Sequence, residues 1–284
     1  MHSPDLEAAL QLVEQRMRML ARHGTGRAGE AAAAHLDAGG SRVRARLALH
    51  AALALGRPGI EAVAIAAACE LLHNASLVHD DLQDRDPLRR GRPSVWRAHG
   101  DAAAICVGDL LLSSAYAALA DCGAQAARLI AHTHQRVGAV IRGQCADLTL
   151  KGRADVSIAT YETVAADKSG PLLSLPLELA LLLAGSAHHV PRAVDAASLF
   201  AVAYKMTDDL EDVERDALNE ELNVVAVLAA AGVHSPLQAA ARLALQRFAE
   251  ARQAALALPA GAGQLLADFA EQRIGSLSAV QVPA

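Results

Sequence analysis

The chain has 284 residues and a formal net charge of −5 at pH 7. This balance does not favour binding to the nucleic-acid backbone, which attracts basic proteins. Hydrophobic residues form 53% of the sequence and aromatic residues only 2%, so aliphatic side chains must fill the core.

The sequence indicates helix nearly throughout, because alanine, leucine, arginine and glutamate dominate it and favour helix. We predict one all-α domain over residues 1–284, with about a dozen helices whose neighbours run antiparallel because the gaps between them are short. Breaks that contain glycine or proline separate these helices, at residues 24–26, 39–40, 56–59, 91–93, 123, 152, 185–191, 232–236 and 259–263.

The cysteines and the chain start indicate a cytoplasmic protein. The cysteines lie singly in predicted helices, so we expect buried free thiols at Cys69, Cys106, Cys122 and Cys145. Asp5 and Glu7 precede any apolar run, unlike a signal peptide. The longest apolar runs, such as residues 171–184 with Glu178, are too short to span a bilayer, so we expect no transmembrane segment.

The first candidate binding segment is Gly39–Arg44. Its two glycines break a helix and present Arg42 and Arg44 at the start of the next one. Taken alone, this pattern fits ordinary solvated arginines.

An apolar helix then leads into a group of acids. A helix turns about 100° per residue, so Asp80 and Asp84 lie on one face and His73, two turns earlier, lies close to it. Asp81 lies between the two acids. Pro87 and the residues after it end the helix.

Carboxylates on one helix face repel each other, so a divalent cation or an arginine must offset their charge. Oxygen ligands without thiolates suit Mg²⁺, which also binds substrate phosphate oxygens. Arg89 and Arg90 follow directly and could clamp a phosphate. A capped helix end with surface salt bridges explains a single group of this kind about as well.

A second acidic group changes that balance. Asp208, Asp209 and Asp212 repeat the spacing of the first group, at the end of another apolar helical run over residues 190–206. Two acidic helix ends far apart in sequence predict one shared metal site that faces a diphosphate.

These motifs resemble those of the trans-isoprenyl diphosphate synthases of the farnesyl and geranylgeranyl type, from about Gly39 to about Val225. The resemblance implies a helical bundle around a central cavity, a homodimer and three Mg²⁺ ions. It implies a trans-prenyltransferase that condenses an allylic diphosphate with isopentenyl diphosphate, head to tail, into a longer all-trans prenyl diphosphate. Geranylgeranyl diphosphate is favoured over farnesyl diphosphate as the product.

The resemblance also implies roles for single residues. Gly143–Leu148 matches the family's Gly-Gln-x-x-Asp-Leu motif, and Lys168–Gly170 matches its Lys-Thr-Gly motif. The implied catalytic residues are Asp80, Asp81, Asp84, Lys168 and Asp208, and the implied metal ligands are Asp80, Asp84, Asp147, Asp208, Asp209 and Asp212. The implied substrate-binding residues are Arg42, Arg44, His73, Arg89, Arg90, Gln144, Lys168, Ser169 and Lys205. His79 is expected to be structural.

The chain departs from the family pattern at several places. Ser41 stands where the family has a lysine, and Ala45 replaces a proline. Lys205 replaces a glutamine, and the lysines that normally follow the second acidic motif are absent. We expect Lys205 to supply part of the missing positive charge, and the acidic segment after Asp208 to become ordered only with metal and diphosphate.

Small side chains precede the first acidic motif. Ala75 and Ser76 would line the pocket that receives the growing hydrocarbon, and with no bulk there the pocket stays open. Leu72 and Tyr116 are the candidates to close it further down. Close helix packing is the alternative explanation for the two small residues.

Three alternative functions remain. A class I terpene cyclase shares the fold but usually has a different second metal motif and an aromatic pocket. A head-to-head condensing synthase lacks the Arg-Arg-Gly turn. A non-catalytic partner subunit of a prenyl synthase would fit the departures at Ser41 and after Asp212.

Overall fold

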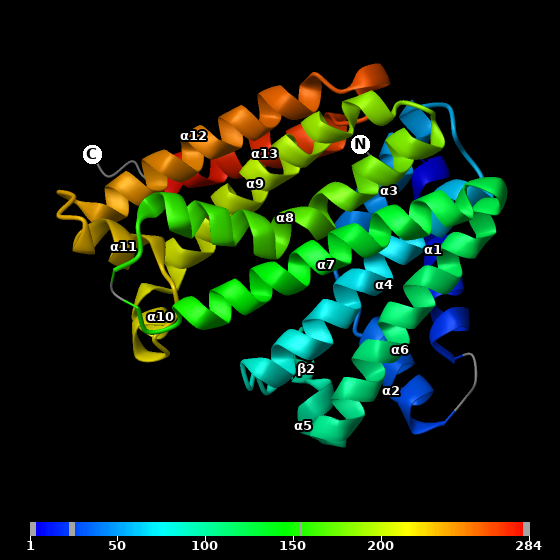
Figure 1. The fold of residues 1–284 in the computed structure, drawn as a ribbon, viewed down its shortest axis with the longest axis horizontal. Helices are drawn as coiled ribbons and strands as arrows, with labels where there is room; N and C mark the ends of the chain where they lie inside the picture. Colours follow the sequence, from blue (N-terminus) through cyan, green and yellow to red (C-terminus); the bar gives the residue numbers. More distant parts are fainter. Residues whose placement is uncertain (1–3, 23–25, 154, 281–284) are drawn as a thin grey trace. The chain divides into compact units, whose positions relative to one another are not determined.

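The computed structural model describes residues 4–22, 26–153 and 155–280, and it confirms the all-α prediction (Figure 1). The α-helices are α1 (Pro4–Arg22), α2 (Arg27–Asp37), α3 (Val43–Ala54), α4 (Ile60–Gln83), α5 (Val95–His99), α6 (Asp101–Leu119), α7 (Ala126–Leu150), α8 (Ile158–Leu183), α9 (Val190–Glu211), α10 (Val213–Leu218), α11 (Val224–Ala230), α12 (Pro236–Leu256) and α13 (Gln264–Val280). Short 3₁₀ helices lie at Ala120–Gln125, Ala187–His189 and Pro259–Gly261.

The described residues form two compact units. The first contains the chain up to His132 together with Leu179–Gly185, and the second contains Thr133–Glu178 and the chain from Ser186 onward. We predicted a single domain over residues 1–284 with a central cavity. Both features involve the two units together, so both stay predictions.

Helix α4 is the core of the first unit, where it packs against α1, α3 and α6. Its buried face consists largely of alanine with isoleucine, leucine and valine, and small side chains let neighbouring helices approach closely. The helix ends where the sequence predicts. The Asp84 amide still donates to the Asp80 carbonyl at 2.8 Å, and Pro87 lies shortly beyond.

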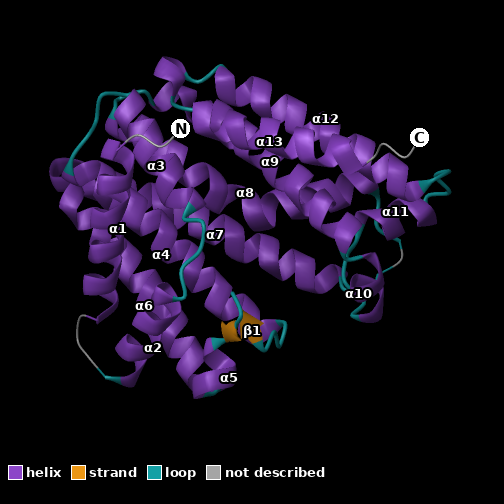
Figure 2. Cartoon of the chain, turned by 180° about the vertical axis from the view of Figure 1, so that it is seen from behind, coloured by secondary structure: helices purple, strands orange, loops and turns teal. Residues whose placement is uncertain are grey.

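A small hairpin follows α4. The strands β1 (Leu88–Arg89) and β2 (Arg92–Pro93) pair antiparallel, and Figure 2 marks them in orange. Arg90 (φ 53°) and Gly91 (φ 74°) form its two-residue turn in the left-handed conformation that hairpin turns favour. The turn therefore fixes where the two neighbouring arginines of the motif lie.

Helix α9 occupies the corresponding place in the second unit. It packs along α12, and α13 contacts both helices (Figure 1). A buried cluster that includes Tyr161, Val202, Met206, Val224 and Leu228 surrounds the carboxyl-terminal half of α9. The helical run predicted over residues 190–206 is confirmed by α9, which continues to Glu211.

Two further expectations concern burial. All four cysteines are free, but Cys106 and Cys145 are exposed, so the prediction of buried thiols was wrong for these two because their helix faces are solvated. Two stretches, Ile60–Gln83 and Asp101–Leu150, are long and apolar enough to cross a membrane by length and composition. In the first, 67% of the apolar window is buried inside the protein, as in the core helix of a globular domain.

Candidate active site

The first acidic motif separates into outward and inward side chains. Asp84 is exposed and Asp80 is half-buried at the end of α4, whereas Asp81 is fully buried. The Arg89 guanidinium donates to Oδ1 of Asp81, from Nε at 2.8 Å and also from Nη2. Burial raises the pKa of Asp81, and the hydrogen bonds from Arg89 oppose that shift. Asp81 therefore anchors the hairpin through Arg89 in this conformation.

The two arginine-containing motifs of the first unit meet at Arg90. Its guanidinium donates to the Gly39 carbonyl, and a Cβ added at Gly40 would lie 2.9 Å from the Arg90 Cζ atom. A side chain at position 40 would thus displace Arg90. The glycines that break the helix in sequence leave the space that this arginine occupies.

His73 lies in an electropositive cluster of the first unit. Burial lowers the pKa of His73 well below its usual value, and the positive charges of Arg44 and Arg90 lower it further. The imidazole is therefore neutral at physiological pH beside two guanidinium groups. Such a cluster is suited to an anion, and guanidinium groups match the oxygens of a diphosphate.

Arg42 lies inside the protein, only 5% exposed. Its Nε donates to Glu14 at 2.5 Å, and its Nη2 donates to the Leu36 carbonyl at 2.7 Å. The buried Glu70 lies 3.8 Å from Nη1 of Arg42 and accepts a hydrogen bond from the Ala45 amide at 3.1 Å. This geometry gives Arg42 a structural role, and the substrate contact predicted for it has no support here.

In the second unit, α7 and α8 come into close contact at Gly143. A Cβ there would lie 2.5 Å from the carbonyl carbon of Asp167, so only glycine allows this approach. Beside the contact, Lys168 Nζ donates to Asp147 Oδ2 at 2.6 Å. The two motifs that contain these residues are thus brought together, with Gln144 half-buried and Ser169 exposed nearby in the chain.

The second acidic motif also divides by helix face. Asp208 is partly exposed, and burial raises its pKa to about 6. Asp212 accepts from Arg215 at 2.6 Å. Asp209 is fully buried and accepts from Lys205, Tyr161 and the Val224 amide. Its predicted role as a direct metal ligand therefore has no support in this conformation.

The side chains at the helix ends fit Mg²⁺ as a partial coordination shell. Asp80 with Asp84 and Asp208 with Asp212 are oxygen donors one turn apart, the donor type that Mg²⁺ prefers. Among the described residues, no three His, Cys, Asp or Glu side chains converge closely enough to hold an ion alone. Mg²⁺ commonly completes its shell with water and substrate phosphate oxygens, so the sparse protein shell agrees with it.

The residues predicted to control chain length belong to the first unit and are buried or partly buried there. Leu72 and Ala75 are buried, at 3% and 2% exposed, and Ser76 donates to the His73 carbonyl at 2.9 Å. Tyr116 of α6 is partly buried, and burial raises its pKa. Close helix packing is therefore one role of Ala75 in this conformation.

The packing of His79 supports the structural role expected of it. Its imidazole lies against Gly108 of α6, where a Cβ would come within 2.0 Å of the His79 Nε2 atom.

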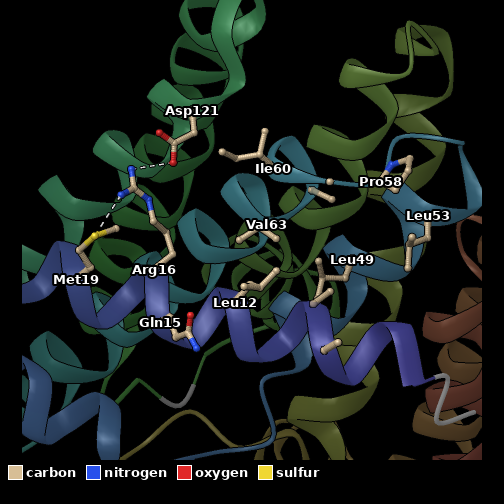
Figure 3. A pocket seen from close by; sticks show the side chains of 14 residues that line it. Leu12, Gln15, Arg16, Met19, Leu49, Leu53, Pro58, Ile60, Val63 and Asp121 are labelled. Carbon is tan, nitrogen blue, oxygen red and sulfur yellow. Dashed lines mark hydrogen bonds and ion pairs between the residues drawn. The ribbon is translucent and has the colours of Figure 1, made fainter.

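A hollow of about 940 Å³ lies elsewhere in the first unit, between α1, α3 and α4 (Figure 3). Figure 3 shows aliphatic side chains around it, such as Leu12, Leu49 and Val63, with the Arg16–Asp121 ion pair at one side. None of the residues predicted for the site lines this hollow.

Sequence reasoning missed three residues that support the site. Glu70 contacts the segment after the two glycines, and Tyr161 and Asn223 hold the end of α9. A glutamate inside the apolar run of α4 was a usable signal, because acids are rarely buried without a partner. No pattern in the sequence singles out Tyr161 or Asn223.

Comparison with solved structures defines the fold class. The decaprenyl diphosphate synthase from Rhodobacter capsulatus superposes with a TM-score of 0.85 over 96% of each chain, at 23% identity. At that identity the likeness shows the isoprenoid synthase fold alone.

The family follows from the sequence comparison. Residues 27–224 match the polyprenyl synthetase family model, and the chain belongs to this family. The family that the sequence motifs predicted is thereby confirmed.

Two curated relatives illustrate the range of this family. The (2E,6E)-farnesyl diphosphate synthase of Mycobacterium tuberculosis is 39% identical over 176 residues, which are 60% of this chain and 48% of that protein. The chloroplastic geranylgeranyl pyrophosphate synthase of Capsicum annuum is 33% identical over 201 residues, which are 67% of this chain and 54% of that protein. The chain thus spans about half the length of the curated relatives it matches.

Proposed function

We propose that the chain is a Mg²⁺-dependent trans-prenyltransferase that condenses an allylic diphosphate with isopentenyl diphosphate head to tail. The product is a longer all-trans prenyl diphosphate, geranylgeranyl diphosphate in preference to farnesyl diphosphate. We further propose that the enzyme is a cytoplasmic homodimer. Membership of the polyprenyl synthetase family supports the reaction class.

The observation on which the proposal rests is the basic cluster of the first unit. The positive charges of Arg44 and Arg90 lower the pKa of His73, whose imidazole is neutral. All three residues belong to the same unit as Asp80 and Asp84 at the end of α4. A diphosphate needs guanidinium donors, and Mg²⁺ needs carboxylate oxygens. We assign Arg44, Arg90 and His73 to isopentenyl diphosphate.

The second unit supplies the proposed contacts to the allylic diphosphate. Lys168 is a compact cation 31% exposed, so it can reach a ligand, and Asp208 has a pKa raised to about 6 by burial. A carboxylate in this state gains most from a bound cation, because the cation offsets the cost of its burial. Lys168 would leave Asp147 to bind phosphate, which would let Asp147 turn toward the metal.

The chemistry then follows from these groups. When bound, Mg²⁺ neutralises the charge that develops on the departing diphosphate. Lys168 would add positive charge to this leaving group. Aliphatic side chains exclude water from the allylic cation, which the isopentenyl double bond attacks. The departing diphosphate accepts the proton that is lost, so no protein side chain is required as a base.

The preference for geranylgeranyl diphosphate rests on Ala75 and Ser76, which carry no bulk one turn before Asp80. Ala75→Phe is expected to shorten the main product, and its distribution by chromatography checks this. The control is Ala103→Phe, at a half-buried position on α6 outside the proposed site. Unchanged products in Ala75→Phe would reject the assigned role of position 75.

The decisive experiment incubates the full chain with Mg²⁺, isopentenyl diphosphate and one of three allylic starters, dimethylallyl, geranyl or farnesyl diphosphate. Chromatography of the products is expected to show elongated prenyl diphosphates. Asp80→Asn is expected to abolish turnover while its circular dichroism melting curve matches the wild type, and Asp109→Asn, an exposed acid on α6, is the control. Cyclic hydrocarbons from one substrate would instead identify a cyclase. No turnover alone, with turnover restored by a second synthase subunit, would identify a partner subunit.

A further inference from the structure

Asp209 is the most completely enclosed carboxylate of the second acidic motif. It is 0% exposed, and both of its oxygens accept hydrogen bonds. Lys205 donates to Oδ1, while the Tyr161 hydroxyl and the Val224 amide each donate to Oδ2 at 2.7 Å. A carboxylate that is fully buried and already accepts from three donors is not accessible to a metal ion in this conformation.

The same residue is joined to the acidic segment that follows it. Asn223 is the N-cap of α11, and its Nδ2 donates to the Asp209 carbonyl at 2.9 Å and to Asp216 Oδ2 at 2.9 Å. Its Oδ1 accepts from the Val225 amide at 2.9 Å. The end of α9 and the start of α11 are therefore closed into one loop through buried polar contacts.

Helix phase separates this carboxylate from its neighbours. Successive residues lie about 100° apart around a helix, so Asp209 and Asp208 point in different directions. Asp209 faces the core beside Tyr161, whereas Asp208 and Asp212, one turn apart, lie on the partly exposed side.

The enclosure of Asp209 depends on its donors. A buried charge is costly unless it is paired and hydrogen-bonded, and removal of one partner leaves the other uncompensated. Lys205 is the cation bonded to Asp209. Lys205 thus adds positive charge to an acidic stretch in which Arg215 is the one basic residue between Asp208 and Glu221.

We propose that Lys205, Tyr161 and Asn223 are positioning residues that use Asp209 as a structural anchor. They fasten residues 212–224 and fix the end of α9, and with it Asp208 and Asp212, before metal or diphosphate binds. This is the opposite of the sequence expectation that the segment becomes ordered only with its ligands. The part that concerns Asp208 rests on the proposed function, whereas the fastening of the segment does not.

The test is amide hydrogen exchange of the metal-free full chain, followed by mass spectrometry. Loss of a hydrogen bond to a buried charge in Tyr161→Phe or Lys205→Gln is expected to speed exchange across residues 212–224 about tenfold or more. Peptides from α12 are expected to exchange as in the wild type. Arg252→Gln is the control, because it removes an exposed ion pair with Glu271 that lies outside this network.

A second measurement separates positioning from ligation. Asp208→Asn is expected to weaken Mg²⁺-dependent binding of inorganic diphosphate in calorimetry by a larger factor than Asp209→Asn, whereas only Asp209→Asn speeds exchange of the segment. Lys205→Arg is expected to restore slow exchange, and if Lys205→Gln fails to fold, Tyr161→Phe and Lys205→Arg decide the question.

Two results would overturn the proposal. One is unchanged exchange over residues 212–224 in both Tyr161→Phe and Lys205→Gln. The other is a loss of diphosphate binding in Asp209→Asn equal to that in Asp208→Asn without any change in exchange. Absence of prenyl transfer would reject the proposed function but would leave the exchange result to decide this inference.

Discussion

The Arg90 guanidinium donates a hydrogen bond to the carbonyl oxygen of Gly39, 51 residues earlier in the chain. This contact joins the two-glycine segment to the turn of the β1–β2 hairpin. It places Arg90 in the cluster whose charges lower the pKa of His73. The proposed anion site of the first unit therefore depends on backbone space as well as on charge.

Gly40→Ala is expected to displace Arg90. Gly40 has φ +128°, and an added Cβ would lie 2.9 Å from the Arg90 Cζ atom. The displaced guanidinium loses a charge-assisted contact, so the KM for isopentenyl diphosphate should rise about tenfold. Steady-state kinetics measure this effect.

The matched control is Gly39→Ala. Gly39 also has a positive φ, of +83°, but no atom lies within 4 Å of an added Cβ. It should therefore show the backbone strain without the steric displacement. Equal KM values for the two variants would show that the space beside Arg90 has no part in binding.

Arg42→Lys is expected to lower stability more than it changes substrate affinity. Lysine cannot reproduce the guanidinium contacts to Glu14 and Leu36, and loss of a buried partner costs about 2–4 kcal/mol. Urea unfolding measures the loss.

Arg46→Lys is the control for that variant, because Arg46 of α3 forms a partly exposed pair with Glu7 of α1. Its cost should stay below about 1 kcal/mol. A raised KM for isopentenyl diphosphate in Arg42→Lys with wild-type stability would return Arg42 to the substrate-binding residues.

The sequence predicted the ends of α4 and α9 because both depend on local rules. Apolar runs followed by acids, and by proline after α4, define where each helix ends and which acids share its exposed face. Spacing alone therefore predicts that Asp80 lies near Asp84, and Asp208 near Asp212, on one helix face.

Contacts that these side chains make with residues of other helices could not be predicted from spacing. Spacing within α9 does not reveal that Tyr161, 48 residues away, donates to Asp209. In the same way, nothing near Arg42 in the sequence indicates Glu14, 28 residues away. Asp209 was predicted as a metal ligand and Arg42 as a substrate contact from motifs, which give the type of side chain but not its partners in the fold; both roles stay predictions.

His35 is expected to make stability depend on pH. Burial, together with the positive charge of Arg90, lowers the pKa of His35 to about 4. The unfolded chain, with a histidine pKa of about 6.5, binds this proton before the folded chain does. The contribution is therefore fully present above pH 6.5 and is lost as the pH falls toward 4.

His35→Phe keeps a ring but removes the ionisation. The loss of unfolding free energy between pH 7 and pH 4.5 should be smaller in the variant than in the wild type, by about 1–3 kcal/mol. Urea unfolding at both pH values measures the difference. His134→Phe, on the exposed side of α7, is the control. The same pH dependence in His35→Phe and the wild type would rule out His35 as its source.

Gly143→Ala is expected to separate α7 from α8. Its Cβ would lie 2.5 Å from the Asp167 backbone, which cannot move without shifting α8, and overpacking of this kind costs about 1–3 kcal/mol. Lys168 follows Asp167 directly in α8, so the shift would also move Lys168 away from the position from which it is proposed to bind the allylic diphosphate. Thermal unfolding should show lower stability, and the KM for the allylic diphosphate should rise together with it.

Gly138→Ala, in the same helix, is the matched substitution that is expected to raise stability instead of lowering it. The nearest atom to its added Cβ is the flexible Arg142 side chain at 3.5 Å, so the substitution meets no fixed obstacle. Alanine favours helix over glycine by about 0.5–1 kcal/mol, and Gly138→Ala should therefore stabilise the protein. If Gly143→Ala is stabilising as well, the close approach of α7 and α8 at Gly143 is not required, and the pairing of Lys168 with Asp147 does not depend on it.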